Sequence, residues 1–202
     1  TSYSEYIKNI YGPLATEKRL KSIMNDNFYA VAYGEKVEEE KINIILSCAL
    51  ASPSPANKQP WEFIVIKNVQ CRSMIQKEAE QAKAYLAERS GWKWLPGFKL
   101  NFITEAPVLI AVVGDPSKNG AEQFLNVPSE GYINACSAAI QNICLASHSL
   151  GLGTLWLSLY EKEAVRKILG IDAQKDPVGI VCLGYPAGNP PIAPDRTADR
   201  PV

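Results

Sequence analysis

The feature of this sequence that most constrains its fold is the apolar run PVLIAVVG at residues 107–114. The run is far shorter than the ~20 residues that a membrane-spanning helix needs. Its β-branched, uninterrupted apolar character is typical of a strand that is buried on both faces of a sheet. Because such a sheet needs helices on both sides, the run predicts a layered protein of α and β elements.

The rest of the chain supplies those elements. Residues 38–51 have apolar side chains at the spacing of an amphipathic helix, and Pro53 and Pro55 end it. Further helices are predicted at 70–90, 130–150 and 161–169, and strands at 61–67, 108–114, 153–158 and 178–184. Since no repeat or low-complexity linker interrupts this alternation, we expect one domain over residues 1–202. Its ends are a divergent region at 1–36 and an extended, proline-rich arm at 186–202.

Composition excludes several classes of protein. With 21 basic and 21 acidic residues the net charge is zero, so the chain lacks the basic footprint of a nucleic-acid or membrane-binding protein. The N-terminus has no signal-peptide pattern, and five cysteines without a CxxC pair are typical of separate reduced thiols. We therefore expect a cytoplasmic protein. A single histidine, His148, makes a metal site difficult to build.

Side-chain chemistry for catalysis is also scarce. There is no phosphate-binding P-loop and no G-x-S-x-G nucleophile motif. GLGT at 151–154 follows a helix and enters a strand, which is the reverse of a dinucleotide-binding fingerprint. His148 falls in the last turn of the helix at 130–150, where capping or a dipole interaction explains it better than catalysis. If the protein is an enzyme, a cofactor is expected to carry the chemistry, with no catalytic side chain and no metal.

Three segments carry more polar and glycine residues than structure alone requires. Residues 51–66 place neutral hydrogen-bonding side chains before a strand, which suits the edge of a planar heterocycle. Residues 137–158 end in glycines that permit close backbone approach. The arm contains Asp195, Arg196 and Arg200, and an arginine fork can hold a phosphate. Turn chemistry, a helix cap and a solvated arm are the alternative explanations.

Taken together, these segments resemble the FMN-dependent nitroreductases. PSPANKQPWEFIV at 53–65 resembles the signature loop of that family. Residues 138–142 with GLGTLW at 151–156 resemble its central helix and following strand, and LGYPA at 183–187 followed by Asp195-Arg196 resembles its closing motif. The resemblance runs from about Val37 to Arg196.

The resemblance implies an α+β fold, an α/β sandwich in which helices flank a central, mostly antiparallel sheet. It also implies an intertwined homodimer with two FMN sites at the interface. The loop residues would line the FMN of the partner subunit. Thr154 and Leu155 would present backbone groups to the flavin ring. Arg196 and Arg200 would reach the phosphate. The implied loop contacts are Pro53, Ser54, Pro55, Asn57 and Gln59.

The implied reaction is a ping-pong transfer of electrons. NAD(P)H reduces the flavin and leaves, and an electron-poor acceptor such as a nitroaromatic or a quinone takes its place. Reductive removal of a substituent is a further chemistry of the family. Neither the acceptor nor the choice between NADH and NADPH can be read from the sequence.

One departure from the family pattern concerns the phosphate. An R-x-S-x-R motif that holds it would fall at residues 26–37, which contain no arginine. Losing two charge-assisted contacts would weaken binding by about two to four orders of magnitude. An insertion could bring Lys18, Arg19, Lys21 and Ser22 into this role. The alternative hypothesis is a non-catalytic ligand-binding or regulatory dimer with weakened or lost flavin binding.

The segment GWKWLPGF at 91–98 contains Trp92, Trp94 and Phe98 among glycines and a proline. Packing in the core or the dimer interface is one explanation. The other is a lid that selects flat aromatic substrates by stacking.

Overall fold

The computed structural model describes residues 32–33, 35–125 and 130–186. The predicted phosphate contacts Lys18, Arg19, Lys21, Ser22, Arg196 and Arg200 therefore lie outside the described residues, as do most of the divergent N-terminal region and of the arm.

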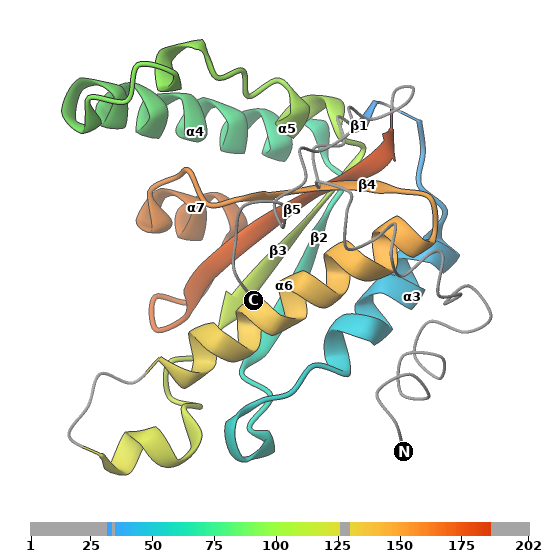
Figure 1. Ribbon diagram of the computed structural model, residues 1–202, viewed down its shortest axis with the longest axis vertical. Helices are drawn as coiled ribbons and strands as arrows, with labels where there is room; N and C mark the ends of the chain where they lie inside the picture. Colours follow the sequence, from blue (N-terminus) through green and yellow to red (C-terminus); the bar gives the residue numbers. More distant parts are fainter. Residues whose placement is uncertain (1–31, 34, 126–129, 187–202) are drawn as a thin grey trace, which may run out of the picture.

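A five-stranded sheet forms the centre of the molecule, and each of its described strand pairs is antiparallel (Figure 1). The order is β1-β5-β3-β2, and β4 pairs with β5. All seven residues of β3 are buried, as the opening apolar run predicts. The strands are β1 (Ala32–Tyr33), β2 (Trp61–Ile66), β3 (Val108–Gly114), β4 (Gly153–Leu157) and β5 (Asp176–Pro186).

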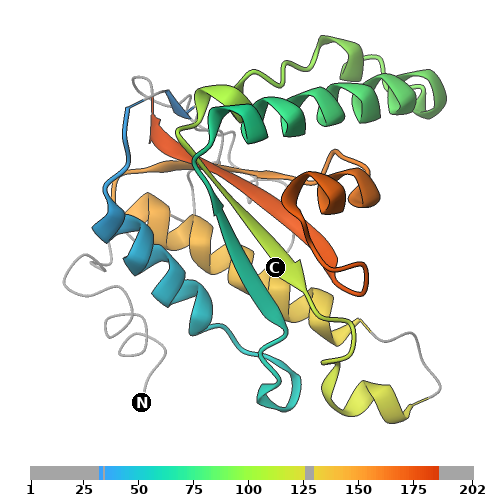
Figure 2. The same cartoon turned by 180° about the vertical axis from the view of Figure 1, so that it is seen from behind.

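Helices cover both faces of this sheet, which confirms the predicted α/β sandwich. Figures 1 and 2 show α3 and α6 on one face and α4, α5 and α7 on the other. Each side has its own buried cluster, the first around Ile140 and Ile143 and the second around Ile75 and Ile103. None of the described helices has the length and apolarity needed to cross a membrane. The helices are α3 (Glu39–Leu50), α4 (Val69–Ser90), α5 (Phe102–Glu105), α6 (Gly131–Ser149) and α7 (Lys162–Leu169).

The strand β5 is longer at both ends than the predicted 178–184. Its N-terminal extension contains Pro177, a residue that usually argues against a strand. The proline is tolerated because the register of β3 and β5 shifts between Val112 and Val113, next to the Pro177 pairing position. At the other end, Tyr185 and Pro186 pair with β1, a short strand that the sequence does not signal.

The end of α6 follows the predicted pattern. His148 lies in the last turn, and Gly151 has the left-handed φ of +77° that glycine permits. The final carbonyls accept hydrogen bonds from the backbone N–H groups of Leu150, Gly151 and Leu152. The helix therefore stops sharply just before β4.

The five cysteines form no disulfide, as predicted. Burial and the nearby Asp176 carboxylate raise the pKa of the Cys136 thiol to about 12. Burial also raises the pKa of Cys182, to about 12. These two thiols are therefore protonated near neutral pH, which suits core packing rather than reactivity.

Candidate functional site

The loop at residues 53–59 presents neutral polar groups on the outside of the molecule. The Ser54 Oγ atom accepts a hydrogen bond from the backbone N–H of Gln59 at 3.0 Å. The Gln59 side-chain amide donates in turn to Asn57 Oδ1 at 3.1 Å. The side chains of Asn57 and Gln59 are exposed. The loop therefore holds amide groups in fixed positions where a ligand can reach them.

Three non-glycine residues of this loop have the left-handed backbone conformation. The φ angles are +49° at Ala56, +53° at Asn57 and +45° at Gln59. Each costs on the order of 1–3 kcal/mol and persists only when the surrounding structure imposes it. Such clusters of strain are typical of binding and catalytic sites.

Pro55 packs closely against two glycines next to this part of the loop. A Cβ atom on Gly120 would lie 2.7 Å from Pro55 Cβ, and one on Gly131 would lie 3.0 Å from Pro55 Cγ. Pro55 belongs to the 3-10 turn η2 (Pro55–Asn57), and Gly120 begins the 3-10 turn η4 (Gly120–Phe124). The two glycines thus form the surface against which the loop is fixed.

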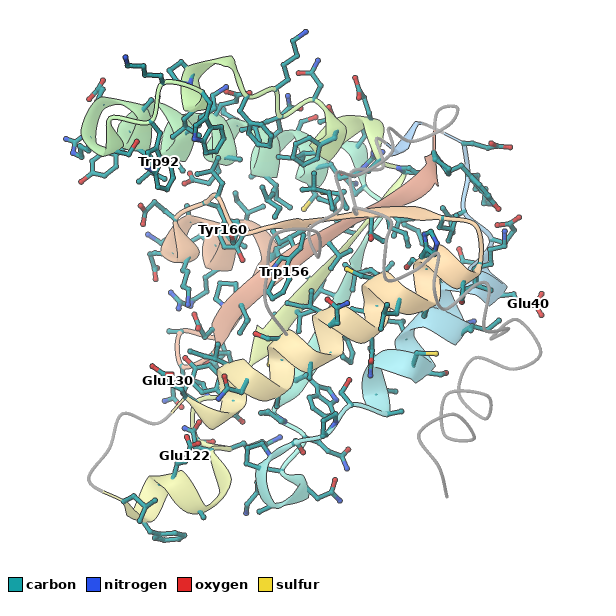
Figure 3. All side chains as sticks on the ribbon, viewed as in Figure 1. Glu40, Trp92, Glu122, Glu130, Trp156 and Tyr160 are labelled. Atoms are coloured by element: carbon teal, nitrogen blue, oxygen red, sulfur yellow. The ribbon has the colours of Figure 1, made fainter. Side chains whose placement is uncertain are left out.

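The N-terminus of α6 lies beside this loop, and three of its backbone donors are already used. Glu122 Oε2 accepts from the N–H groups of Glu130 at 3.0 Å and Gly131 at 2.8 Å. Asn119 Oδ1 accepts from the Tyr132 N–H at 2.9 Å. Figure 3 shows Glu122 and Glu130 close together at this end of the molecule. This helix terminus is therefore capped by the protein rather than open to an anion.

A tyrosine–aspartate–lysine cluster supports the same end of the sheet. Tyr132 donates its hydroxyl to Asp176 Oδ2 at 3.1 Å, and Lys162 Nζ donates to the same oxygen at 2.6 Å. Burial and the Asp176 charge raise the pKa of Tyr132 to about 12. Sequence reasoning missed this cluster because its members come from α6, α7 and β5. By contrast, the Asn119-Gly120 dipeptide is a turn signal in the sequence, and it could have indicated the turn that packs against the loop at 53–59.

The other predicted contacts lie on β4. The Thr154 hydroxyl is fully enclosed and makes no regular hydrogen bond, so only its backbone could serve a ligand. In an antiparallel ladder, neighbouring residues point their N–H and C=O groups alternately toward and away from the paired strand. Because β4 pairs only with β5 among the described strands, either Thr154 or Leu155 points its backbone groups away from the sheet.

The structure does not bring the loop and β4 together within one chain. The loop packs on Gly131 at the first turn of α6, whereas β4 begins at Gly153, just after its last turn. Nineteen residues at about 1.5 Å per residue separate the ends of this helix by more than 20 Å. Figures 1 and 2 both show the two segments well apart. A site that uses both must therefore combine two copies of the chain.

The aromatic cluster lies on the surface, which makes the prediction of core packing wrong for its tryptophans. Trp92 and Trp94 are 54% and 58% exposed and stack on each other at 5.7 Å between ring centroids. They are exposed because the 3-10 turn η3 (Leu95–Gly97) buries Leu95 in their place. Phe98 is half-buried and contacts Trp94 edge-on at 5.8 Å. Dimer packing and a lid both stay predictions.

Comparison with known proteins agrees with this architecture. The model of the nitroreductase family matches residues 34–185, which is most of the chain and, apart from Pro186, all of the sheet beyond β1. The chain therefore belongs to the nitroreductase family.

Individual proteins resemble this chain in sequence or in fold. The chain is 32% identical over 194 residues to a protein of Methanothermobacter thermautotrophicus provisionally named NADH dehydrogenase/NAD(P)H nitroreductase, covering 93% of this chain and 88% of that one. An iodotyrosine deiodinase bound to FMN and 3-iodo-L-tyrosine shares the fold with a TM-score of 0.74 at 21% identity, over 87% and 94% of the two chains. An FMN-dependent nitroreductase of Clostridium difficile has a TM-score of 0.66 at 22% identity, over 88% and 93%.

Proposed function

We propose that the protein is an FMN-dependent oxidoreductase that transfers electrons from NAD(P)H to an electron-poor acceptor such as a nitroaromatic or a quinone. The observation that carries the proposal is the strained loop at 53–59, which fixes neutral amides outward. Family membership and the FMN in the two solved relatives support it. When bound, FMN supplies the ring that accepts and delivers the electrons.

The residues on hand fit such a group. Asn57 and Gln59 offer exposed amides that can donate and accept without charge. The free edge of β4 at Thr154 and Leu155 offers backbone groups that are preorganised and cannot titrate. Pro53, Ser54 and Pro55 would form the wall of the site. Arg196 and Arg200 are assigned to the phosphate. The role of the missing N-terminal arginines would fall to Lys18, Arg19, Lys21 and Ser22.

A homodimer completes this arrangement. The loop and β4 lie at opposite ends of α6, and a two-fold axis across the middle of a helix exchanges its ends. One copy would thus supply the loop and the other the strand. The face beside α6 is suited to a partner, because the outer side of α3 has a groove of about 530 Å³ bordered by Ile44 and Ser47. Ile44 is 41% exposed and Leu50 is 55% exposed on this helix.

The exposed Trp92–Trp94 pair is assigned to the acceptor. Stacked indoles offer a flat, apolar surface that suits aromatic molecules. The iodotyrosine deiodinase relative makes halogenated phenols a second class of acceptor, since its structure contains 3-iodo-L-tyrosine. Turnover of a nitroaromatic, a quinone and an iodophenol, with product analysis, distinguishes these classes.

The first test is the visible spectrum and mass of the purified protein. We expect flavin absorbance, release of FMN on denaturation, and a mass of about 44 kDa, twice the 22.2 kDa of one chain. Ile44→Glu should give a colourless monomer, because it places a charge on the proposed interface. Met74→Glu on the exposed side of α4 is the matched control and should keep both dimer and colour.

A second pair of variants tests the loop. Asn57→Gly removes the amide and keeps the left-handed backbone, and we expect FMN affinity to fall about tenfold. Ala56→Gly makes the same backbone change without loss of a polar group and should stay within threefold of the original affinity. A dimer that binds no added FMN would overturn the oxidoreductase and favour the ligand-binding or regulatory alternative.

A further inference from the structure

Arg72 is a buried cation that forms no ion pair with any residue the structure describes. It lies in the first turn of α4 and is only 7% exposed. Its Nη1 atom donates to the carbonyl oxygens of Thr104, at 2.7 Å, and Ala106. Its Nε is enclosed without a partner, and no carboxylate among the described residues forms an ion pair with it. A buried positive charge without an ion pair is costly, and an anion bound nearby would offset part of that cost.

The arginine borders a cavity of about 300 Å³ between the approach to α3, the start of α4, α5 and the start of β3. Figure 1 shows α5 beside β1 at this corner of the molecule. Two further cations, Lys36 and Lys67, line the same cavity. Its volume is at the lower end of the range for small-molecule sites and is sufficient for a phosphate group with its water.

The charges around the cavity leave a positive surplus. The carboxylates on its wall are Glu39 and Glu105, against three cations. Glu39 is paired with Lys67, whereas Arg72 and Lys36 form no ion pair within the described part of the chain. Val37 and Val108 contribute a buried apolar wall, which reduces dielectric screening and strengthens the pull on an anion.

We propose that this cavity binds a phosphate group, either free phosphate or a phosphate monoester. The positive charges that Arg72 and Lys36 contribute to the cavity wall suit a compact dianion. The cavity lies beyond the end of β2, whereas the loop at 53–59 lies before its start. The site is thus separate from the loop contacts proposed for FMN, and the inference does not depend on the oxidoreductase proposal.

The test is a calorimetric titration of the full-length protein, saturated with FMN if it binds it, with inorganic phosphate at constant ionic strength. We expect saturable binding. Lys36→Gln should raise the Kd about threefold and Arg72→Lys about tenfold, because the second replaces the buried guanidinium with a smaller ammonium. Glu105→Gln should lower the Kd about threefold by removing repulsion. Lys77→Gln, an exposed charge on the same helix, is the matched control and should leave the Kd unchanged.

Phenyl phosphate distinguishes the two sources of the ligand. If it binds at least as tightly as inorganic phosphate and follows the same variants, the ligand is a monoester; if it fails where phosphate binds, the ligand is the free ion. No saturable binding of either, or equal Kd values for Lys36→Gln, Glu105→Gln and the original protein, would overturn the site. The Lys36→Gln and Glu105→Gln variants therefore test the site even if Arg72→Lys fails to fold. Acetate binding as tightly as phosphate would overturn the assignment to a phosphate group.

Discussion

The two ends of β2 are built on different principles. Before the strand, the loop at 53–59 has three left-handed residues and neutral amides facing outward. After the strand, Asn68 has an ordinary φ of −66° and caps the regular 22-residue helix α4. Charged groups from four segments surround the cavity beside Arg72. The loop end is therefore distinguished by its backbone conformation. The cavity end has regular secondary structure and is distinguished by its charged side chains.

This difference indicates what each end can recognise. Fixed neutral amides can hydrogen-bond to the edge of an uncharged planar group. The strength of these hydrogen bonds depends on the positions of the donor and acceptor atoms rather than on long-range electrostatic attraction. Buried cations attract any compact anion and depend less on backbone detail. Variants that alter backbone shape should therefore affect the loop end strongly, and changes in charge should act at the cavity.

Gly120→Ala should have the largest effect on the loop end. The new Cβ would lie 2.7 Å from Pro55 Cβ and 3.0 Å from its carbonyl carbon, at a φ of +64° that alanine adopts with strain. Overpacking and the left-handed backbone together should lower the free energy of unfolding by about 3 kcal/mol, measured by urea denaturation.

Gly170→Ala separates these two causes. Gly170 has a similar φ of +65°, but nothing lies within 4 Å of its Cβ position. Its substitution should cost only about 1 kcal/mol. Equal losses for the two variants would show that Pro55 is not held against Gly120, and the shape-based account of the loop would fail.

Alkaline pH should weaken the loop end through Tyr132. Its pKa is about 12 in the folded protein because of burial and Asp176, against an ordinary value of 10.0. Since the folded pKa is raised, the stabilisation is complete below pH 10 and is lost as the pH rises toward 12. At pH 11 the loss is about 1.4 kcal/mol.

Tyr132→Phe should remove this part of the pH dependence. Urea unfolding at pH 8, 10 and 11 should give a shallower decline than in the original protein. Tyr160 and Cys136, whose pKa values burial also raises, remain in both proteins, so the difference isolates Tyr132. Tyr85→Phe on the exposed part of α4 is the control, and a slope as shallow as that of Tyr132→Phe would contradict the assignment.

Much of this fold could be predicted because its signals are local. The short α5 is not among the predicted helices. Strand β3 coincides with the apolar run at 108–114, and the predicted helices and the other long strands begin and end within one residue of their predicted bounds, except β5, which is two residues longer at each end. Strand β5 starts earlier than predicted because the register between β3 and β5 shifts beside Pro177, which allows a proline where strand propensity disfavours one. Likewise, β1 exists only through its pairing with the end of β5.

The candidate site divides in the same way. The motif at 53–65 identifies the polar loop, because its residues are consecutive. Its strain could not be predicted, since alanine does not favour a positive φ and the glycines that pack against Pro55 lie more than 60 residues away in the sequence. The cavity around Arg72 was missed for the same reason, because its charges come from segments up to about 70 residues apart.

The smallest effect expected is a gain in stability from Ala56→Gly. Glycine adopts the φ of +49° without the Cβ penalty of about 1–2 kcal/mol, and its greater freedom in the unfolded chain offsets part of that gain. The net result should be about 0.5 kcal/mol of added stability in urea unfolding. Ala84→Gly, exposed in regular α4 beyond the cavity end, should instead destabilise by about 1 kcal/mol. A gain in the free energy of unfolding for Ala56→Gly and a loss for Ala84→Gly would establish that the backbone is strained only on the loop side of β2. Losses of similar size for both variants would refute this difference between the two ends of the strand.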